Sequence, residues 1–127
     1  MEFPEELRYS QEHEWVAVDG VRARIGITDF AQDSLGDVVY VELPSVDANV
    51  MAHASCAEIE STKSVSEIFS PVTGTIVEVN ATLDDAPEQV NADPYGAGWI
   101  FVVEMADPSE VDALLDAAAY RALVEEA

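Results

Sequence analysis

One primary amine stands out among the side chains that could carry chemistry, because Lys63 is the only lysine in the 127 residues. Two runs typical of β-strands, Ala57–Glu60 and Ser64–Phe69, flank it, and its immediate neighbours are small and polar. This pattern predicts a tight hairpin with the lysine at its tip. Most lysines at such a position are only solvated surface residues. An amine held out on a rigid stalk is also a good acceptor for a modifying enzyme.

The segment after the hairpin predicts a turn and a further strand. In Ser70-Pro71-Val72-Thr73-Gly74 the proline fixes its own φ, and Gly74 can adopt a positive φ. The run Thr75–Asn80 that follows has the alternation of a strand.

The charge balance restricts the partners of this chain. Its 26 acidic residues face only five basic ones, and the formal net charge is −21. Nucleic acids and anionic membranes repel such a surface. A salt-rich cytosol, as in halophiles, would screen the self-repulsion of the chain. A surface that binds basic partner enzymes is a second explanation, and the two are compatible.

The sequence lacks the common catalytic motifs. It has no Gly-x-Ser-x-Gly, no His-Glu-x-x-His, no Gly-x-x-x-x-Gly-Lys and no Cys-x-x-Cys. The two histidines, His13 and His53, provide no metal-ligand cluster. The single cysteine, Cys56, permits no internal disulfide, and we expect it to be a buried apolar residue. We therefore expect a protein that is not an enzyme acting alone.

The N-terminal residues and the lengths of the apolar runs indicate the cellular compartment of the protein. Met-Glu-Phe-Pro-Glu-Glu is acidic, without the apolar stretch of a secretory signal or the arginines of a transit peptide. No run approaches the ~20 apolar residues that a membrane span needs. We expect a cytoplasmic protein.

The hydrophobic pattern predicts one α+β domain, with strands first and helices last. Asp19-Gly20 is a strong signal for a hairpin, and Thr28 is placed to cap a short helix that Gly36 ends. The expected elements are strands at Trp15–Val18, Val21–Ile27, Val38–Leu43 and Trp99–Met105, a helix at Asp29–Leu35, and helices from Asp107 onward.

Three further expectations concern side-chain direction and irregular segments. We expect Val39, Val41 and Leu43 to point inward from their strand. The segment Met1–Leu7 is expected to be loosely ordered. Ala81–Gly98, with several prolines and glycines, is expected to be a long irregular connection.

Several separated motifs occur in a fixed order along the chain. They are His13-Glu14-Trp15-Val16, Ile25-Gly26-Ile27-Thr28, Ala31-Gln32, Leu35-Gly36-Asp37-Val38-Val39, Val41-Glu42-Leu43-Pro44, Glu60-Ser61-Thr62-Lys63, Ser70-Pro71-Val72-Thr73-Gly74, Asn91-Ala92-Asp93-Pro94-Tyr95 and Gly98-Trp99. Their order and spacing are far more specific than a lone Glu-Ser-x-Lys. By these motifs the chain resembles, from about Leu7 to Leu123, the H-protein family of the glycine cleavage system, the lipoyl-carrying shuttle proteins of that complex.

The resemblance implies a fold and a cofactor. The fold would be mostly β within the α+β class: a flattened lipoyl/biotinyl-type β barrel-sandwich hybrid with an N-terminal hairpin, a short helix and C-terminal helices. Residues 1–127 would form one lipoyl-carrier domain, with 107–127 as a C-terminal helical extension. Lys63 would be the lipoylation site, joined to lipoic acid through an amide.

The resemblance also implies partners. In the family the arm collects an aminomethyl group from glycine decarboxylase (the P protein) and passes it to aminomethyltransferase (the T protein). Dihydrolipoyl dehydrogenase (the L protein) then reoxidises the dithiol. With the lipoylating enzyme as a fourth partner, the carrier is expected to be a monomer, and a substrate of these enzymes.

A few positions match family sites around the arm. Glu60 and Gly74 match positions associated with recognition by the lipoylating enzyme, and a turn-forming role explains Gly74 equally well. The positions that match a cleft for the loaded arm are Glu14, Ile27, Leu35 and Glu67. The two carboxylates could hold the cationic amine of the loaded arm, with the aliphatic residues as apolar walls. Both glutamates could also be ordinary solvated acids.

Three other functions stay open, and two departures from the family are visible. A biotin carrier shares the lysine hairpin, but its lysine normally lies between methionines, whereas here Thr62 and Ser64 are the neighbours. An H-like protein that relays lipoyl groups to other complexes would have the same motifs. A structural or regulatory relative without modification is the third. The family often has a glycine turn where this chain has Met51–Ser55, and Thr62 replaces the more usual valine.

Overall fold

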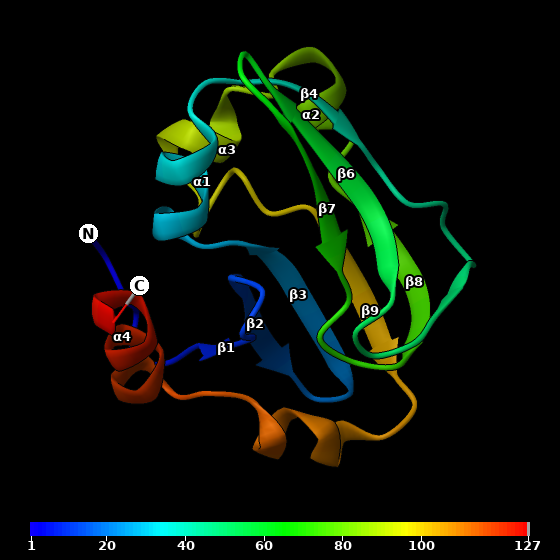
Figure 1. The fold of residues 1–127 in the computed structure, drawn as a ribbon. Coiled ribbons are helices and arrows are strands. Elements are labelled where there is room, and N and C mark those ends of the chain that lie inside the picture. Colours follow the sequence, from blue (N-terminus) through cyan, green and yellow to red (C-terminus); the bar gives the residue numbers. More distant parts are fainter. Residues whose placement is uncertain (127) are drawn as a thin grey trace.

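Two antiparallel β-sheets form the centre of the computed structural model, which describes residues 1–126 (Figure 1). The larger sheet has the strand order β1-β2-β3-β9-β8-β5, and the smaller one has the order β4-β6-β7. The strands are β1 (Arg8–Tyr9), β2 (Glu14–Asp19), β3 (Arg22–Ile27), β4 (Val38–Glu42), β5 (Asn49–Val50), β6 (Ser55–Ser61), β7 (Val65–Phe69), β8 (Gly74–Val79) and β9 (Phe101–Met105). The helices are α1 (Asp29–Leu35), α2 (Thr82–Asp85), α3 (Gln89–Ala92), the 3₁₀ helix η1 (Pro108–Ala113) and α4 (Ala117–Glu126).

The main hydrophobic core lies between the two sheets. Ile25 and Val103 from the larger sheet join Ile59 and Ile68 from the smaller sheet in one buried cluster. Period-two alternation places these side chains on the inner face of each sheet. No helix among residues 1–126 is long and apolar enough to cross a membrane.

The N-terminal hairpin and the first helix form as the sequence predicts. β2 pairs with β3 down to Asp19 opposite Arg22, and Gly20 in the turn has φ 64°. Thr28 caps α1, because its side-chain oxygen accepts a hydrogen bond from the Ala31 amide, and Gly36 ends the helix with φ 80°. Both positive φ values favour glycine.

One expectation about side-chain direction is wrong. The pairing of β4 with β6 shifts between Val38 and Tyr40, so that β4 contains a bulge. Val38 and Val41 are consequently buried, whereas Val39 is 52% exposed. An extra residue in a strand reverses the faces of the residues around it, which simple alternation from Val41 does not reveal.

The connection 81–98 and the first residues are more ordered than the sequence suggests. α2 and α3 are single turns, too short to show a helical period, and they bury Leu83 and Val90 in the main core. The expectation of an irregular connection therefore holds outside 82–85 and 89–92 and is wrong for these two helical turns. The expectation of a loose N-terminus is also wrong, because the Phe3 ring packs on Tyr120 and the Tyr9 hydroxyl donates to the Pro4 carbonyl at 2.6 Å.

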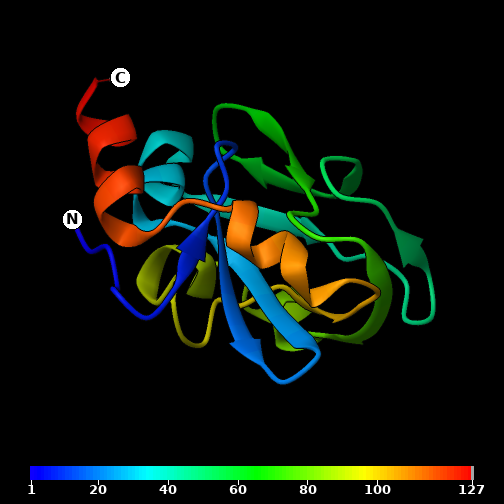
Figure 2. The same cartoon turned by 90° about the horizontal axis from the view of Figure 1, so that it is seen from below.

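The chain ends in two helices that cover the larger sheet's first strands. Asp107 caps η1 by accepting from the Ser109 amide, as predicted, but this element is a 3₁₀ helix. The Asp116 side chain accepts from the Ala119 amide at the start of α4. Figures 1 and 2 both place α1, α4 and the N-terminus on the same side of the molecule, and Figure 1 shows α4 below α1.

Candidate functional site

The lysine hairpin forms as the sequence predicts, with the lysine exposed at its tip. β6 and β7 pair up to Glu60 opposite Val65, and the Ser61 amide donates to the Ser64 carbonyl at 2.8 Å. The Ser61 hydroxyl oxygen accepts from the Lys63 amide at 3.3 Å and from the Ser64 amide at 3.1 Å. The small polar residues therefore hold the turn, and Lys63 itself is free to extend.

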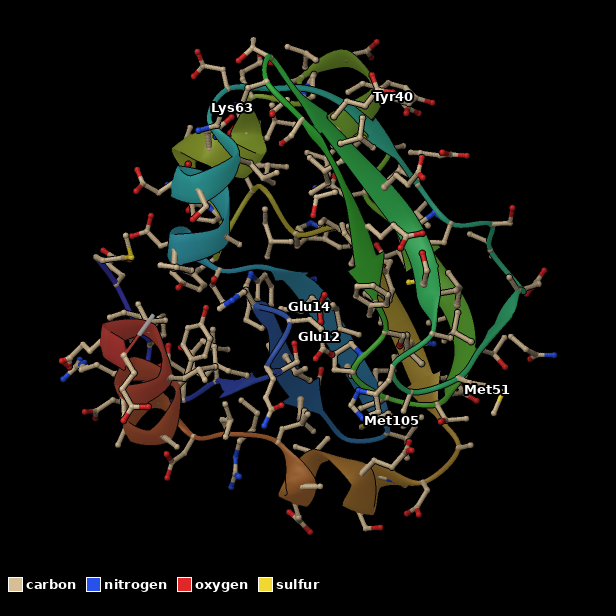
Figure 3. All side chains as sticks on the ribbon, viewed as in Figure 1. Glu12, Glu14, Tyr40, Met51, Lys63 and Met105 are labelled. Atoms are coloured by element: carbon tan, nitrogen blue, oxygen red, sulfur yellow. The ribbon has the colours of Figure 1, made fainter. Side chains whose placement is uncertain are left out.

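The lysine side chain lies against the loop that follows α1. A Cβ at Gly36 would be 3.3 Å from the Lys63 Cε, so the lysine stem passes directly over this glycine. The Thr62 amide donates to the Asp37 carbonyl at 3.0 Å, which fastens the tip to the same loop. Figure 3 shows Lys63 at this end of the molecule, close to α1.

A cavity of about 310 Å³ lies beside the hairpin, between α1, the start of β2 and strand β7. All four cleft positions that the resemblance singled out, Glu14, Ile27, Leu35 and Glu67, contribute to its wall. The other lining residues are Glu12, His13, Phe30, Ala31, Ser34, Ile59, Ser66 and Ile68. The structure thus brings the expected residues together, although they come from four separate elements.

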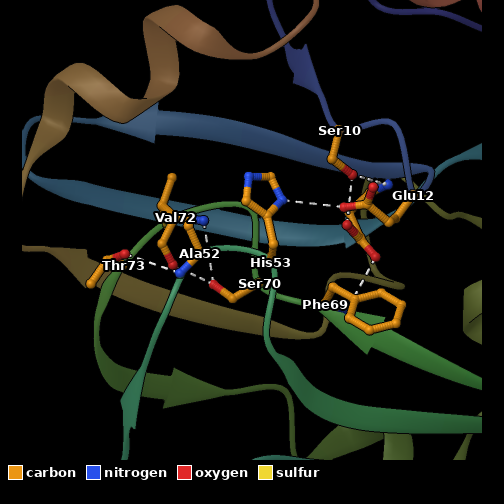
Figure 4. A network of polar contacts seen from close by, with 9 residues as sticks. Ser10, Glu12, Ala52, His53, Phe69, Ser70, Val72 and Thr73 are labelled. Atoms are coloured by element: carbon orange, nitrogen blue, oxygen red, sulfur yellow. Dashed lines mark hydrogen bonds and ion pairs between the residues drawn. The ribbon is translucent and has the colours of Figure 1, made fainter.

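Glu14 is a buried carboxylate that joins the two sheets. Its side chain is almost fully buried, and both oxygens have partners: the Ser10 hydroxyl donates to Oε1 at 2.6 Å, and the Phe69 amide donates to Oε2 at 3.1 Å. Figure 4 labels the two donor residues, Ser10 and Phe69. Burial raises the pKa of Glu14 to about 7, while these two hydrogen bonds act in the opposite direction. Glu14 is therefore not an ordinary solvated acid, whereas Glu67 is exposed.

His13 is a cavity residue that the sequence reasoning left without a role. It adopts φ 70°, its ring lies 4.9 Å from the Phe30 ring, and its Nδ1 is 2.8 Å from the Tyr120 hydroxyl. The Tyr120 hydroxyl is also 2.7 Å from the Thr28 hydroxyl that caps α1. Burial lowers the pKa of His13, so the neutral imidazole is favoured. No local pattern could reveal this, because α4 closes the network from 107 residues away.

The two positions matched to recognition by the lipoylating enzyme lie apart. Glu60 is exposed on β6, three residues before the lysine. Gly74 begins β8 opposite Met105, and a Cβ there would collide with the Glu104 carbonyl oxygen. Its φ is not positive, so the turn-forming expectation is wrong, and close strand approach is the physical reason for a glycine at this position.

The single cysteine packs against the main core, although the sequence predicts a fully buried residue. Cys56 is half-buried in β6, and burial raises the pKa of its thiol to about 12, which makes the thiolate scarce at neutral pH. No group of three or more His, Cys, Asp or Glu residues suited to a metal ion occurs within residues 1–126.

Comparison with known proteins assigns the family. The family model described as "Glycine cleavage H-protein" matches residues 7–127. The chain belongs to the glycine cleavage H-protein family. The H protein from Brevibacillus brevis is 56% identical over 126 residues, covering 99% of this chain and 100% of the relative. The H protein from Beutenbergia cavernae is 58% identical over 123 residues, covering 97% of each chain.

A solved structure extends the similarity to the fold. The crystal structure of a glycine cleavage system H protein from Mycobacterium marinum superimposes with a TM-score of 0.88 at 41% identity, covering 96% of this chain and 98% of that one. The family consists of non-catalytic carriers of the glycine cleavage system that typically hold a lipoyl-lysine. The biotin-carrier alternative has no support in these comparisons. They also give no support to a halophilic origin, which stays a hypothesis based on charge.

Proposed function

We propose that this chain carries lipoic acid on Lys63, joined through an amide, and shuttles an aminomethyl group between the enzymes of the glycine cleavage system. The observation that supports this most directly is one exposed lysine, the only one in the sequence, at the tip of the β6–β7 hairpin beside a cavity. Lysine plus lipoyl reaches about 14 Å from the backbone. The carrier can therefore stay outside a partner enzyme while the arm enters its active site.

The residues of the cavity fit a bound lipoyl group. Ile27 and Leu35 give it apolar walls, and Glu14 places a carboxylate inside it. When bound, the lipoyl group supplies a dithiol that carries the aminomethyl group and then takes part in electron transfer to dihydrolipoyl dehydrogenase. The amine of a loaded arm is cationic, so an ionised Glu14, with Glu67 at the rim, would attract it and keep it away from bulk water.

The proposed carrier function also implies a fold type, a single domain and a set of partner enzymes. We assign the fold to the lipoyl/biotinyl-type barrel-sandwich hybrids, and residues 1–127 to one carrier domain with 107–127 as an extension. Glycine decarboxylase, aminomethyltransferase, dihydrolipoyl dehydrogenase and a lipoylating enzyme are the proposed partners, of a monomeric cytoplasmic carrier. Glu60 is the better candidate for recognition by the lipoylating enzyme, because it lies beside the hairpin tip.

The intact mass of protein purified from its own cells tests the attachment site. We expect one lipoyl adduct, located on Lys63 by peptide mapping. The matched variant Lys63→Arg keeps the positive charge but offers no amine for an amide, and it should carry no adduct. A wild-type chain without any adduct, from cells that contain lipoate, would refute the carrier proposal.

An H-like lipoyl relay for other complexes is the alternative function, and mass alone does not separate it from glycine cleavage. Glycine-dependent loading by the decarboxylase separates the relay function from the glycine cleavage function. The lipoylated protein should gain an aminomethyl group when incubated with glycine and the decarboxylase, whereas a relay protein would gain none.

A further inference from the structure

The side chain of Asn91 on α3 clamps the loop under the lysine. Its Oδ1 accepts from the Val38 amide at 2.8 Å, and its Nδ2 donates to the Gly36 carbonyl at 2.8 Å. The same Nδ2 donates to the Gln32 Oε1 at 3.0 Å. One side-chain amide thus holds both backbone groups that flank Asp37 and reaches back to α1.

The clamped loop makes the two contacts that orient the arm. The Asp37 carbonyl, between the two clamped groups, accepts from the Thr62 amide of the hairpin tip. Gly36 supports the lysine stem, and its φ of 80° with ψ −158° is a conformation that favours glycine. Leu35, the residue before it, belongs to the cavity wall. The surface under the lysine is therefore continuous with the cavity entrance.

We propose that Asn91 is a positioning residue for the arm: by fixing residues 36–38 it fastens the hairpin tip and keeps open the path from Lys63 to the cavity. This inference rests on the proposed carrier function and adds a residue that contacts neither the lysine nor the cavity. It also gives a physical role to the motif Asn91-Ala92-Asp93-Pro94-Tyr95, which the attachment chemistry leaves unexplained.

The chain offers a closely matched control in Asn80. Its Nδ2 also donates to two backbone carbonyls, those of Ala97 and Trp99, both at 2.8 Å. These bonds order the same 80–99 segment without touching residues 36–38. Asn91→Ala and Asn80→Ala therefore remove similar bonds, and only the first releases the loop under the lysine.

The first readout uses the unmodified protein. Amide hydrogen exchange at Thr62 should accelerate about three- to tenfold in Asn91→Ala, because the loss of a typical hydrogen bond changes a local equilibrium by about that factor. Asn80→Ala should leave Thr62 exchange as in the wild type. Equal Thr62 exchange in the two variants would overturn the positioning role.

The second readout uses the lipoylated, aminomethyl-loaded protein. After removal of the decarboxylase, spontaneous release of ammonia should be several times faster in Asn91→Ala than in Asn80→Ala, since the arm would spend less time in the cavity. Unchanged release in Asn91→Ala would contradict the proposal. If Asn91→Ala does not fold, the pair Asn91→Asp and Asn80→Asp replaces it, because aspartate at 91 keeps the acceptor for Val38 and loses both donors.

These outcomes are separate from a failure of the carrier function. A wild-type chain that takes no lipoyl or aminomethyl group refutes the proposed function at the mass-spectrometry step. Normal loading of the wild type together with unaltered Thr62 exchange in Asn91→Ala refutes only the role of Asn91.

Discussion

Glu14 illustrates at the level of one residue how burial and hydrogen bonding compete. The Ser10 hydroxyl and the Phe69 amide stabilise its carboxylate, yet burial is the larger effect and raises the pKa to about 7. Near neutral pH the cavity therefore contains both protonation states of this side chain. A carboxyl group with such a pKa can respond to a cation in the cavity by losing its proton.

The raised pKa of Glu14 predicts a pH dependence of stability. The folded state keeps the proton up to about pH 7, whereas the unfolded state loses it near pH 4.5. The free energy of unfolding should thus fall as pH rises through this window, by up to about 3 kcal/mol. Chemical denaturation at several pH values should show this slope in the wild type and a flatter one in Glu14→Gln. Parallel pH profiles for the two proteins would show that Glu14 has an ordinary pKa.

At the level of elements, one hydroxyl group connects the C-terminal helix to the cavity. Tyr120 on α4 stacks on Tyr9 with ring centroids 4.6 Å apart, and its hydroxyl contacts both His13 and the Thr28 cap of α1. The extension therefore supports the two elements that form one side of the cavity. Its packing explains why a helix with a modest apolar face is held in place.

Removal of this hydroxyl is expected to weaken the connection. Tyr120→Phe keeps the stacked ring and loses the contacts to His13 and Thr28, so the free energy of unfolding should fall by about 1–2 kcal/mol. Equilibrium denaturation measures this. Tyr40→Phe is the control, because Tyr40 is 48% exposed, and it should change stability little; a comparable loss in both variants would argue against the network.

At the level of the whole molecule, negative charge dominates the surface. Within residues 1–126 no lysine or arginine forms an ion pair, and the only such contact of a carboxylate is that of Glu12 with the His53 ring at 3.5 Å. Glu42, Glu58 and Glu67 lie opposite one another across β4, β6 and β7. A hydrogen bond with Glu42 and the neighbouring carboxylates raise the pKa of Glu58. Like charges at paired positions oppose folding.

Salt should therefore stabilise the fold. Raising NaCl from about 0.05 M to about 1 M shortens the Debye length to roughly 3 Å, and we expect a gain on the order of 1 kcal/mol or more in the free energy of unfolding. Denaturation with urea at each salt concentration tests this. Near the sequence pI of about 4.1 the net charge is small, and the salt effect should largely disappear. Stability that is independent of salt at neutral pH would contradict the electrostatic account.

The sequence by itself determined the features that depend on neighbouring residues. The hairpin around Lys63, the Asp19-Gly20 turn and the α1 cap at Thr28 were all predictable, because each is stabilised by groups within a few positions. The family resemblance supplied the cleft positions, which no periodicity shows.

Only the tertiary structure decided the features that depend on distant contacts. The bulge that turns Val39 outward arises from pairing with β6, and the glycine at position 74 is required by β9. The burial of Glu14, the contact of His13 with Tyr120 and the Asn91 clamp each join residues that are more than 50 positions apart. Their physical cause is the packing of sheets and helices against one another, which the linear pattern of polar and apolar residues does not reveal.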